Sequence, residues 1–171
     1  LAGVIIGGRT TLFVAAFAGA MTMTIGLVVG SLAGYFGRWI DALLMRFTEI
    51  FQTMPALLFT MVLIFLLEPG TWKEALALGL TLWPGAARLT RAEFLQLREM
   101  EFVKASQAIG CSDLRIMFRT ILPNAMPPLL AWTTLMVVAA ILFHASLAFF
   151  GLVDINTVSW GSMIGKNRGY A

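Results

Sequence analysis

Long stretches without charge alternate with short charged segments along this chain. Residues 10–37 contain no charged side chain, and residues 120–153 contain His144 as their only ionisable group. A helix rises about 1.5 Å per residue, so either stretch is long enough to cross a hydrocarbon core of about 30 Å. We expect Pro123, Pro127 and Pro128 to break the helix at the start of the second stretch. The pattern therefore predicts membrane spans over residues 10–34 and 128–152.

Two shorter apolar runs predict two more spans. Residues 50–67 are free of charge, with Pro55 near their start, where its missing N–H predicts a kink. Residues 68–74 are expected to form a turn. Residues 75–87 number only 13 and span only if the helix extends to Trp72 and Leu89. The third and fourth predicted spans are therefore 50–67 and 72–89.

Small side chains recur at every fourth position of the first span. A four-residue spacing places them on one face of a helix, where they allow a second helix to approach closely. This face is predicted to be a helix-packing surface, and its members are Ala18, Thr22, Gly26, Gly30 and Gly34.

The charged residues gather in one loop and predict the topology. Ten of the 21 charged side chains lie between Arg88 and Arg119. The segments 35–49 and 88–119 together hold eight of the 12 lysines and arginines, and the rest of the chain holds four. Lysine and arginine are enriched in cytoplasmic loops of membrane proteins. We therefore expect a multi-pass protein of the cytoplasmic membrane with residues 90–124 as a cytoplasmic loop.

Turn chemistry predicts the structure of this loop. Residues 93–109 have helix-forming composition, and Gly110 suits the position just after a helix, where φ is positive. Ser112 or Asp113 is placed to cap a second helix over residues 114–121, which Pro123 is expected to end. A helix, a glycine hinge and a second helix suit two roles. Such a loop either transmits force to a soluble partner or anchors the bundle in the membrane interface.

Composition agrees with a membrane protein. Hydrophobic residues make up 59% of the chain and charged residues 12%, about half the share of a soluble domain. Its class is therefore an all-α membrane protein with a single domain over residues 1–171. The net charge is +3, but the basic residues are interleaved with acidic ones, so nucleic-acid binding is not expected. The chain begins at Leu1 without a charged leader, which suggests a fragment of a longer protein.

No residue pattern predicts catalysis or a bound cofactor. The segment Gly161–Asn167 is one residue too short for a phosphate-binding loop and has asparagine after its lysine. His144 and Ser146 are two residues apart and face different directions on a helix, so they make a poor hydrolytic pair. We therefore expect no catalytic residue, no metal site and no ATP or Mg²⁺ bound by this chain.

His144 has two interpretations. An ionisable side chain within a span is by default a functional candidate, here for the translocation path. Alternatively, it is a neutral histidine that forms a hydrogen bond with a helix neighbour.

Several ordered motifs resemble one transporter family. The loop sequence of residues 101–124 resembles the EAA loop of ATP-binding-cassette (ABC) importer permeases, within the dipeptide, oligopeptide and nickel group. Further similarity covers essentially the whole chain, at residues 8–12, 33–46, 83–89, 145–151 and 159–163. The family has six spans, and this chain resembles the middle four. Two positions depart from the motif, since Lys104-Ala105-Ser106 replaces Glu-Ala-Ala and Thr120 replaces a histidine.

The resemblance implies a fold, a mechanism and partners. It implies a helical bundle of the type I importer kind that moves di- or oligopeptides by alternating access. The implied partners are a second permease, two ATPase subunits that carry ATP and Mg²⁺, an extracytoplasmic solute-binding protein and the lipid bilayer. Residues 103–110 would form the coupling helix, and the implied ATPase-coupling residues are Val103, Lys104, Ala105, Ser106, Ala108, Gly110, Ser112, Asp113, Arg115 and Pro123.

Two alternatives remain open on substrate and energy source. Nickel or another small solute would use the same mechanism. A secondary transporter that works without ATP would need ion-coupling charges in its spans, and His144 is the only candidate that the sequence offers.

Overall fold

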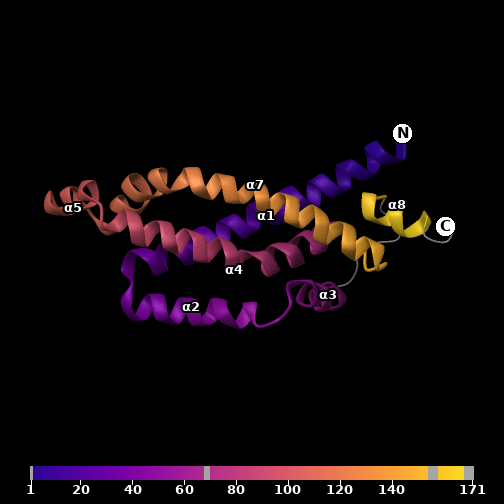
Figure 1. The fold of residues 1–171 in the computed structure, drawn as a ribbon, viewed down its shortest axis with the longest axis horizontal. Helices are drawn as coiled ribbons and strands as arrows, with labels where there is room; N and C mark the ends of the chain where they lie inside the picture. The colour runs from indigo at the N-terminus through magenta and orange to yellow at the C-terminus, as the bar shows by residue number, and fades with distance from the viewer. Residues whose placement is uncertain (1, 68–69, 154–157, 168–171) are drawn as a thin grey trace. The chain divides into compact units, whose positions relative to one another are not determined.

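The computed structural model describes residues 2–67, 70–153 and 158–167, and this part of the chain is helical without strands (Figure 1). The all-α prediction is confirmed. The helices in chain order are α1 (Ala2–Phe36), α2 (Arg38–Gln52), α3 (Ala56–Leu67), α4 (Thr71–Arg98), α5 (Glu101–Ala108), α6 (Asp113–Arg115), the π-helix η1 (Ile116–Ile121), α7 (Leu122–Phe149) and α8 (Trp160–Asn167).

The chain divides into two compact units. Unit 1 comprises Leu1–Thr22, Met54–Leu82 and Thr134–Ala171, and unit 2 comprises Met23–Thr53 and Trp83–Thr133. The helices α1, α4 and α7 contribute to both units.

Two helical stretches of the described chain are long and apolar enough to cross a membrane. They are Gly3–Phe36 and Asp113–Phe149, and α2 with α3 adds a third if the two helices form one broken span. The predicted span 10–34 lies within α1, and most of 128–152 lies within α7, which ends at Phe149. α4 covers residues 72–89, but it is not apolar enough to be counted with these stretches. That all four segments cross the membrane stays a prediction.

Alanine and aliphatic side chains form the core of unit 1. Val14 and Ala18 of α1, Leu78 of α4 and Leu147 of α7 are fully buried in one cluster. The threonine hydroxyls of this core are satisfied within the unit. Thr60, for example, lies 3.0 Å from the hydroxyl of Thr81. Close helix contacts bury these polar groups without leaving a donor free.

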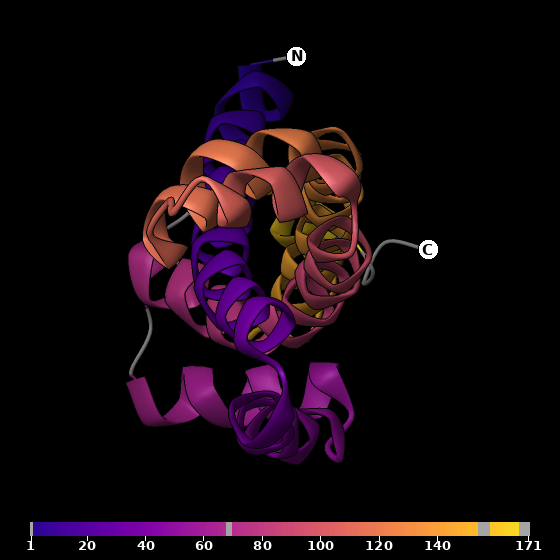
Figure 2. The ribbon, with the colours of Figure 1, turned by 90° about the vertical axis from the view of Figure 1, so that its left-hand side faces the viewer.

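Larger side chains form the core of unit 2. Phe94 of α4, Val103 of α5 and Ile116 of η1 are nearly inaccessible and pack in one cluster. α5 lies beyond the end of α4, at the same end of unit 2 as the start of α7 (Figure 1). Figure 2, turned to face this end, shows the salmon ribbon of α5 and α6 towards the viewer.

Three helix boundaries differ from the prediction. The run 50–67 is divided, because α2 ends at Gln52 and α3 begins at Ala56, after Pro55. The predicted turn at 68–74 is shorter, since α4 begins at Thr71; Glu68 and Pro69 lie outside the described residues. The helix predicted over 93–109 is interrupted between Arg98 and Glu101. This break separates α5 from α4, and α5 then places Val103 in the core of unit 2.

The prediction that prolines end helices in the 120–128 region is wrong. Pro123 lies inside a continuous helical stretch, because η1 leads directly into α7, and the helix also continues past Pro127 and Pro128. The preceding η1 turn widens the backbone, and the Asn124 side-chain amide donates to the Thr120 carbonyl at 2.7 Å. π-Helical turns and side-chain donors are the usual means of accommodating proline in a membrane helix.

The predicted polar tail is only partly described. α8 covers Trp160–Asn167, whereas residues 154–157 and 168–171 lie outside the described residues. The Trp160 indole N–H donates to the Val4 carbonyl at 2.9 Å, which joins α8 to α1 within unit 1.

Candidate functional site

The candidate site is the charged loop, which α5 and the turn after it organise. The N–H of Gly110 donates to the Gln107 carbonyl at 3.0 Å, and that of Cys111 donates to the Ser106 carbonyl at 3.2 Å. These two bonds define a Schellman motif, which requires a left-handed residue after the helix. Gly110 has φ +79°, so its predicted conformation is confirmed. No heavy atom lies within 4 Å of a Cβ added there, so backbone conformation rather than space calls for glycine.

One side chain of α5 points inward while most of the others are exposed. Val103 is fully buried in the core of unit 2, whereas the neighbouring Lys104, Ala105 and Ala108 are exposed. Ile109 is 80% exposed directly before the hinge. A short helix held by one apolar anchor thus presents a mixed apolar and basic face outward, and a protein partner can cover such a face.

Hydrogen bonds fasten the loop to the end of α1. The Tyr35 hydroxyl donates to Asp113 Oδ1 at 2.6 Å. Arg98 Nη1 donates to the Tyr35 carbonyl at 2.9 Å and lies 3.3 Å from the Gly34 carbonyl. These bonds connect two parts of the loop, Arg98 before the hinge and Asp113 after it, to the last turn of α1.

The capping prediction is partly wrong. Ser112 occupies the residue before α6, but its side chain makes no capping hydrogen bond. Asp113 is the first residue of α6 and directs its carboxylate to Tyr35 instead. The Asp113 carboxylate, which could have accepted a capping hydrogen bond from the backbone, accepts one from the distant Tyr35 hydroxyl.

A partly buried ion pair joins α4 to α2. Asp41 accepts hydrogen bonds from Nε and Nη2 of Arg91, the second at 2.6 Å. This hydrogen bond raises the pKa of the Arg91 guanidinium above its usual value. One turn earlier, Arg88 makes a single exposed hydrogen bond to Gln52 at 3.0 Å. The two-point geometry at Arg91 fixes orientation as well as distance.

In unit 2, α4 packs directly on the glycine face of α1. A Cβ added at Gly26 would lie 2.4 Å from the Ala86 Cβ, and one at Gly30 would lie 2.4 Å from the Ala87 carbonyl oxygen. At Gly34 the nearest atom, the Phe94 Cβ, would be 2.6 Å away. Ala18 and Thr22, the other members of the predicted surface, are fully buried in unit 1.

His144 lies outside the loop, in unit 1. It is fully buried, and its Nδ1 is 2.5 Å from Oε1 of Glu74, which is 4% exposed. The other polar atoms of the pair, His144 Nε2 and Glu74 Oε2, have no hydrogen-bond partner. The partner comes from α4 rather than from a neighbouring turn of the same helix. A role for His144 on a translocation path stays a prediction.

Sequence reasoning missed Glu74, Tyr35 and the pair of Asp41 with Arg91. Glu74 falls within the predicted turn 68–74, whereas the structure places it in the first turn of α4. Its only local signal is an acidic residue in the first turn of α4, directly before the apolar run 75–87. The remaining coupling-loop residues, Arg115 and Pro123, are exposed, and Ser106 donates to the Phe102 carbonyl at 2.9 Å.

Comparison with known proteins gives a consistent result. Residues 26–169 match the family described as "Binding-protein-dependent transport system inner membrane component". The dipeptide transport system permease protein DppC of Bacillus subtilis is 38% identical over 158 residues, which cover 92% of this chain and 49% of the relative. The oligopeptide transport system permease protein OppC of the same organism is 36% identical over 159 residues, which cover 92% and 52%.

A solved structure shares the fold. A chain of the inward-facing MetNI methionine ABC transporter superposes with a TM-score of 0.84 at 20% identity, covering 98% of this chain and 81% of that one. The chain spans about half the length of the curated relatives that it matches.

Proposed function

The chain belongs to the family of inner membrane components of binding-protein-dependent transport systems, and we propose that it is a permease subunit of an ABC importer. The observation that carries the proposal is the geometry of α5. A short exposed helix ends in a Schellman turn at Gly110 and is fastened to α1 through Tyr35 and Asp113. This arrangement suits force transmission better than simple anchoring in the interface, because the helix is rigidly connected to a predicted span.

The proposed substrate is a di- or oligopeptide. The support is that the similar proteins are named dipeptide and oligopeptide permeases. No observation on the described residues favours nickel over a peptide.

The proposed mechanism places all covalent chemistry on other chains. Two ATPase subunits would bind ATP and Mg²⁺, and closure of their dimer would move α5 and its turn. The buried Val103 and the hydrogen bond between Tyr35 and Asp113 would pass this motion to α1 and η1. The permease would then alternate between inward-open and outward-open states with a second permease subunit. It would receive substrate from an extracytoplasmic binding protein.

This assembly requires the proposed topology. The loop of residues 90–124 would face the cytoplasm, and the apolar helices would cross the cytoplasmic membrane. A secondary transporter is the rival from another class, and the buried pair of Glu74 with His144 is the feature that it would use. Dependence of uptake on the ATPase subunits separates the two.

The test is transport by the reconstituted importer with Gly110→Pro. Proline fixes φ near −65° and removes the N–H that donates to Gln107, so the turn cannot form. We expect ATP-driven peptide uptake to fall at least tenfold while the complex stays assembled on size exclusion. Gly110→Asn should keep most uptake, because asparagine tolerates the left-handed conformation. Unchanged uptake with Gly110→Pro, or uptake without the ATPases, would overturn the proposal.

Gly151 provides a matched control for the backbone change. It ends α7 with φ +76° and has no heavy atom within 4 Å of an added Cβ, like Gly110, but lies in unit 1. Gly151→Pro and Gly110→Pro therefore each remove a turn N–H, which donates to Ala148 and to Gln107 respectively, and impose the same conformational demand at two places. A loss of coupling in both would indicate general damage to the fold rather than a role of the loop.

A further inference from the structure

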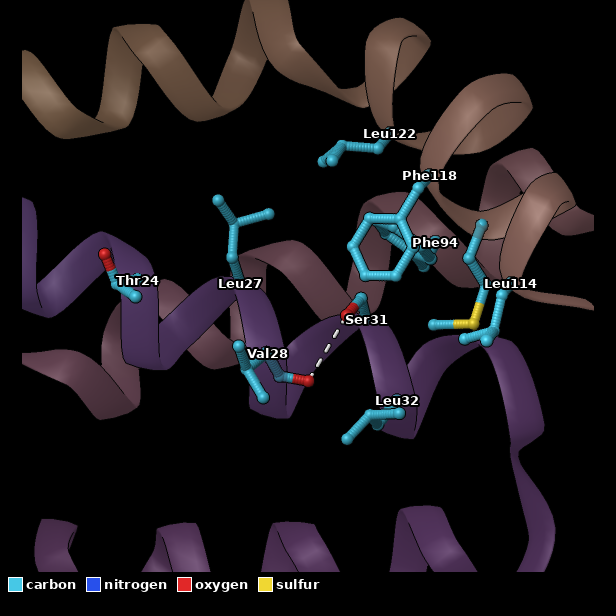
Figure 3. Close-up of a pocket in the computed structure, with 10 residues that line it drawn as sticks. Thr24, Leu27, Val28, Ser31, Leu32, Phe94, Leu114, Phe118 and Leu122 are labelled. Atoms are coloured by element: carbon cyan, nitrogen blue, oxygen red, sulfur yellow. Dashed lines mark hydrogen bonds between the residues drawn. The ribbon is translucent and has the colours of Figure 1, made fainter.

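A groove in unit 2 is not used by the proposed mechanism. It has a volume of about 350 Å³, within the range of about 300–1,000 Å³ of small-molecule pockets. Figure 3 shows Leu27 of α1 and Leu122 of α7 extending into the same space, with Phe118 of η1 beside them. The groove therefore lies between α1 and the η1–α7 junction.

The lining of this groove suits an apolar chain. Of its lining residues, Phe94 and Met117 are each only 1% exposed, whereas Val28, Leu114 and Phe118 are 55%, 65% and 56% exposed. The Ser31 hydroxyl donates to the Val28 carbonyl at 3.2 Å, so it offers no unmet hydrogen bond to a ligand (Figure 3). A hydrocarbon ligand would gain from burial here without leaving the lining serine unpaired.

Two cations follow the exposed apolar residues. Arg115 comes directly after Leu114, and Arg119 comes directly after Phe118. Both arginines are exposed, and neither has an ion pair with another described residue. Leu114, Phe118 and Leu122 recur every fourth residue along the widened turns and all line the groove. Arg115 and Arg119 are also four residues apart, so they lie on one face of the helix, next to the face that lines the groove. Two guanidinium groups on that face suit a single phosphate.

The level of the groove in the fold suits a lipid head group. Ser31 lies five residues before α1 ends at Phe36, which is about 8 Å along the helix axis. The groove is therefore close to the end of an apolar helix long enough to span. Head groups lie at that level, and arginines near helix ends reach them readily.

We propose that this groove binds an anionic phospholipid, with one acyl chain in the groove and the phosphate on Arg115 and Arg119. Charge complementarity favours this occupant, because two exposed guanidinium groups near a membrane surface attract an anionic head group, by about 1 kcal/mol for each cation. The proposal requires that the apolar helices span a membrane, but it does not rest on coupling to an ATPase.

The test is photocrosslinking in lipid nanodiscs that contain the assembled importer. The probes are phosphatidylglycerol and phosphatidylcholine with the same diazirine on an acyl chain, and mass spectrometry locates the adducts. We expect phosphatidylglycerol adducts on groove residues such as Leu27 and Phe118, with much weaker labelling by phosphatidylcholine. Arg115→Gln with Arg119→Gln should weaken phosphatidylglycerol binding about thirtyfold, from about 1 kcal/mol for each cation.

Two controls keep this result interpretable. Arg46→Gln removes one exposed arginine from α2, whose residues do not line the groove, and should leave labelling unchanged. Val28→Trp fills the groove and should abolish its adducts while size exclusion still shows the assembled importer. Equal labelling by both lipids, labelling unchanged by the arginine variants, or crosslinks from the groove to another polypeptide segment in place of lipid would each overturn the proposal.

Discussion

The Tyr35 hydroxyl donates a 2.6 Å hydrogen bond to Asp113, a residue 78 positions later in the chain. This bond joins the last turn of α1 to the first residue of α6, just after the hinge at Gly110. Tyr35 is 7% exposed and belongs to the core of unit 2. The hinge is thus connected to a rigid helix end by a charge-assisted bond rather than by local capping.

We expect Tyr35→Phe to destabilise the fold by about 1.5 kcal/mol, the lower end for a hydrogen bond to a charged group, since Asp113 is exposed. The free energy of unfolding of the purified complex in mixed micelles measures this change. In an Asp113→Ala background the same substitution should cost almost nothing. Additive costs in this double-mutant cycle would show that the two side chains do not interact.

Gly30→Ala should destabilise the packing of α4 on α1 by about 1–3 kcal/mol, the usual cost of overpacking. The added Cβ would lie 2.4 Å from the Ala87 carbonyl and 2.5 Å from the Thr90 Cβ, so the helices must separate. Gly85→Ala is the matched control, because its Cβ would make an ordinary 3.4 Å contact with the Trp132 ring. Equal melting temperatures for the two variants would contradict the close contact.

Arg91→Lys should cost more stability than Arg88→Lys, by about 1 kcal/mol. Lysine cannot reproduce the two-point contact that Arg91 makes with Asp41, whereas Arg88 makes one exposed hydrogen bond to Gln52. Thermal unfolding of both variants at low and high salt measures the difference. If Arg88→Lys were the more damaging change, the assigned role of Arg91 would be wrong.

The buried pair of Glu74 with His144 predicts strong non-additivity. His144→Leu alone leaves a carboxylate unpaired in a core and should cost about 3–5 kcal/mol. Replacing both residues with leucine removes the unpaired group and should restore most of the lost stability. Unfolding of the two single variants and the double variant measures this coupling. A double variant as unstable as the sum of the singles would contradict the pairing.

Local signals predicted much of this fold. The charge-free stretch 10–37 predicted a long helix, and the four-residue spacing of Gly26, Gly30 and Gly34 indicated the face that α4 contacts. Turn chemistry predicted the left-handed Gly110. These features depend on spacing and backbone sterics, which are readable from neighbouring residues alone.

Long-range pairs and backbone irregularities were not readable in this way. Glu74 and His144 are 70 residues apart, and Asp41 and Arg91 are 50 apart, so neither pairing has a local signature. The continuation of α7 through Pro123 depends on the π turn before it and on the Asn124 side chain. Proline preference alone therefore predicted a helix end where the tertiary structure maintains a helix.

Site-directed crosslinking between α5 and the ATPase tests the central claim most directly. Single cysteines replace the exposed Ala108 or Ile109 in a Cys111→Ser background, which removes the only native cysteine. A cysteine at Leu66, which is 71% exposed in α3 of unit 1, is the control. We predict crosslinks from positions 108 and 109 to the ATPase subunits in membranes, with a yield that changes when ATP is added, and none from position 66. The absence of any ATPase adduct from α5, or labelling of α5 by a membrane-impermeant reagent from outside the cell, would contradict the account.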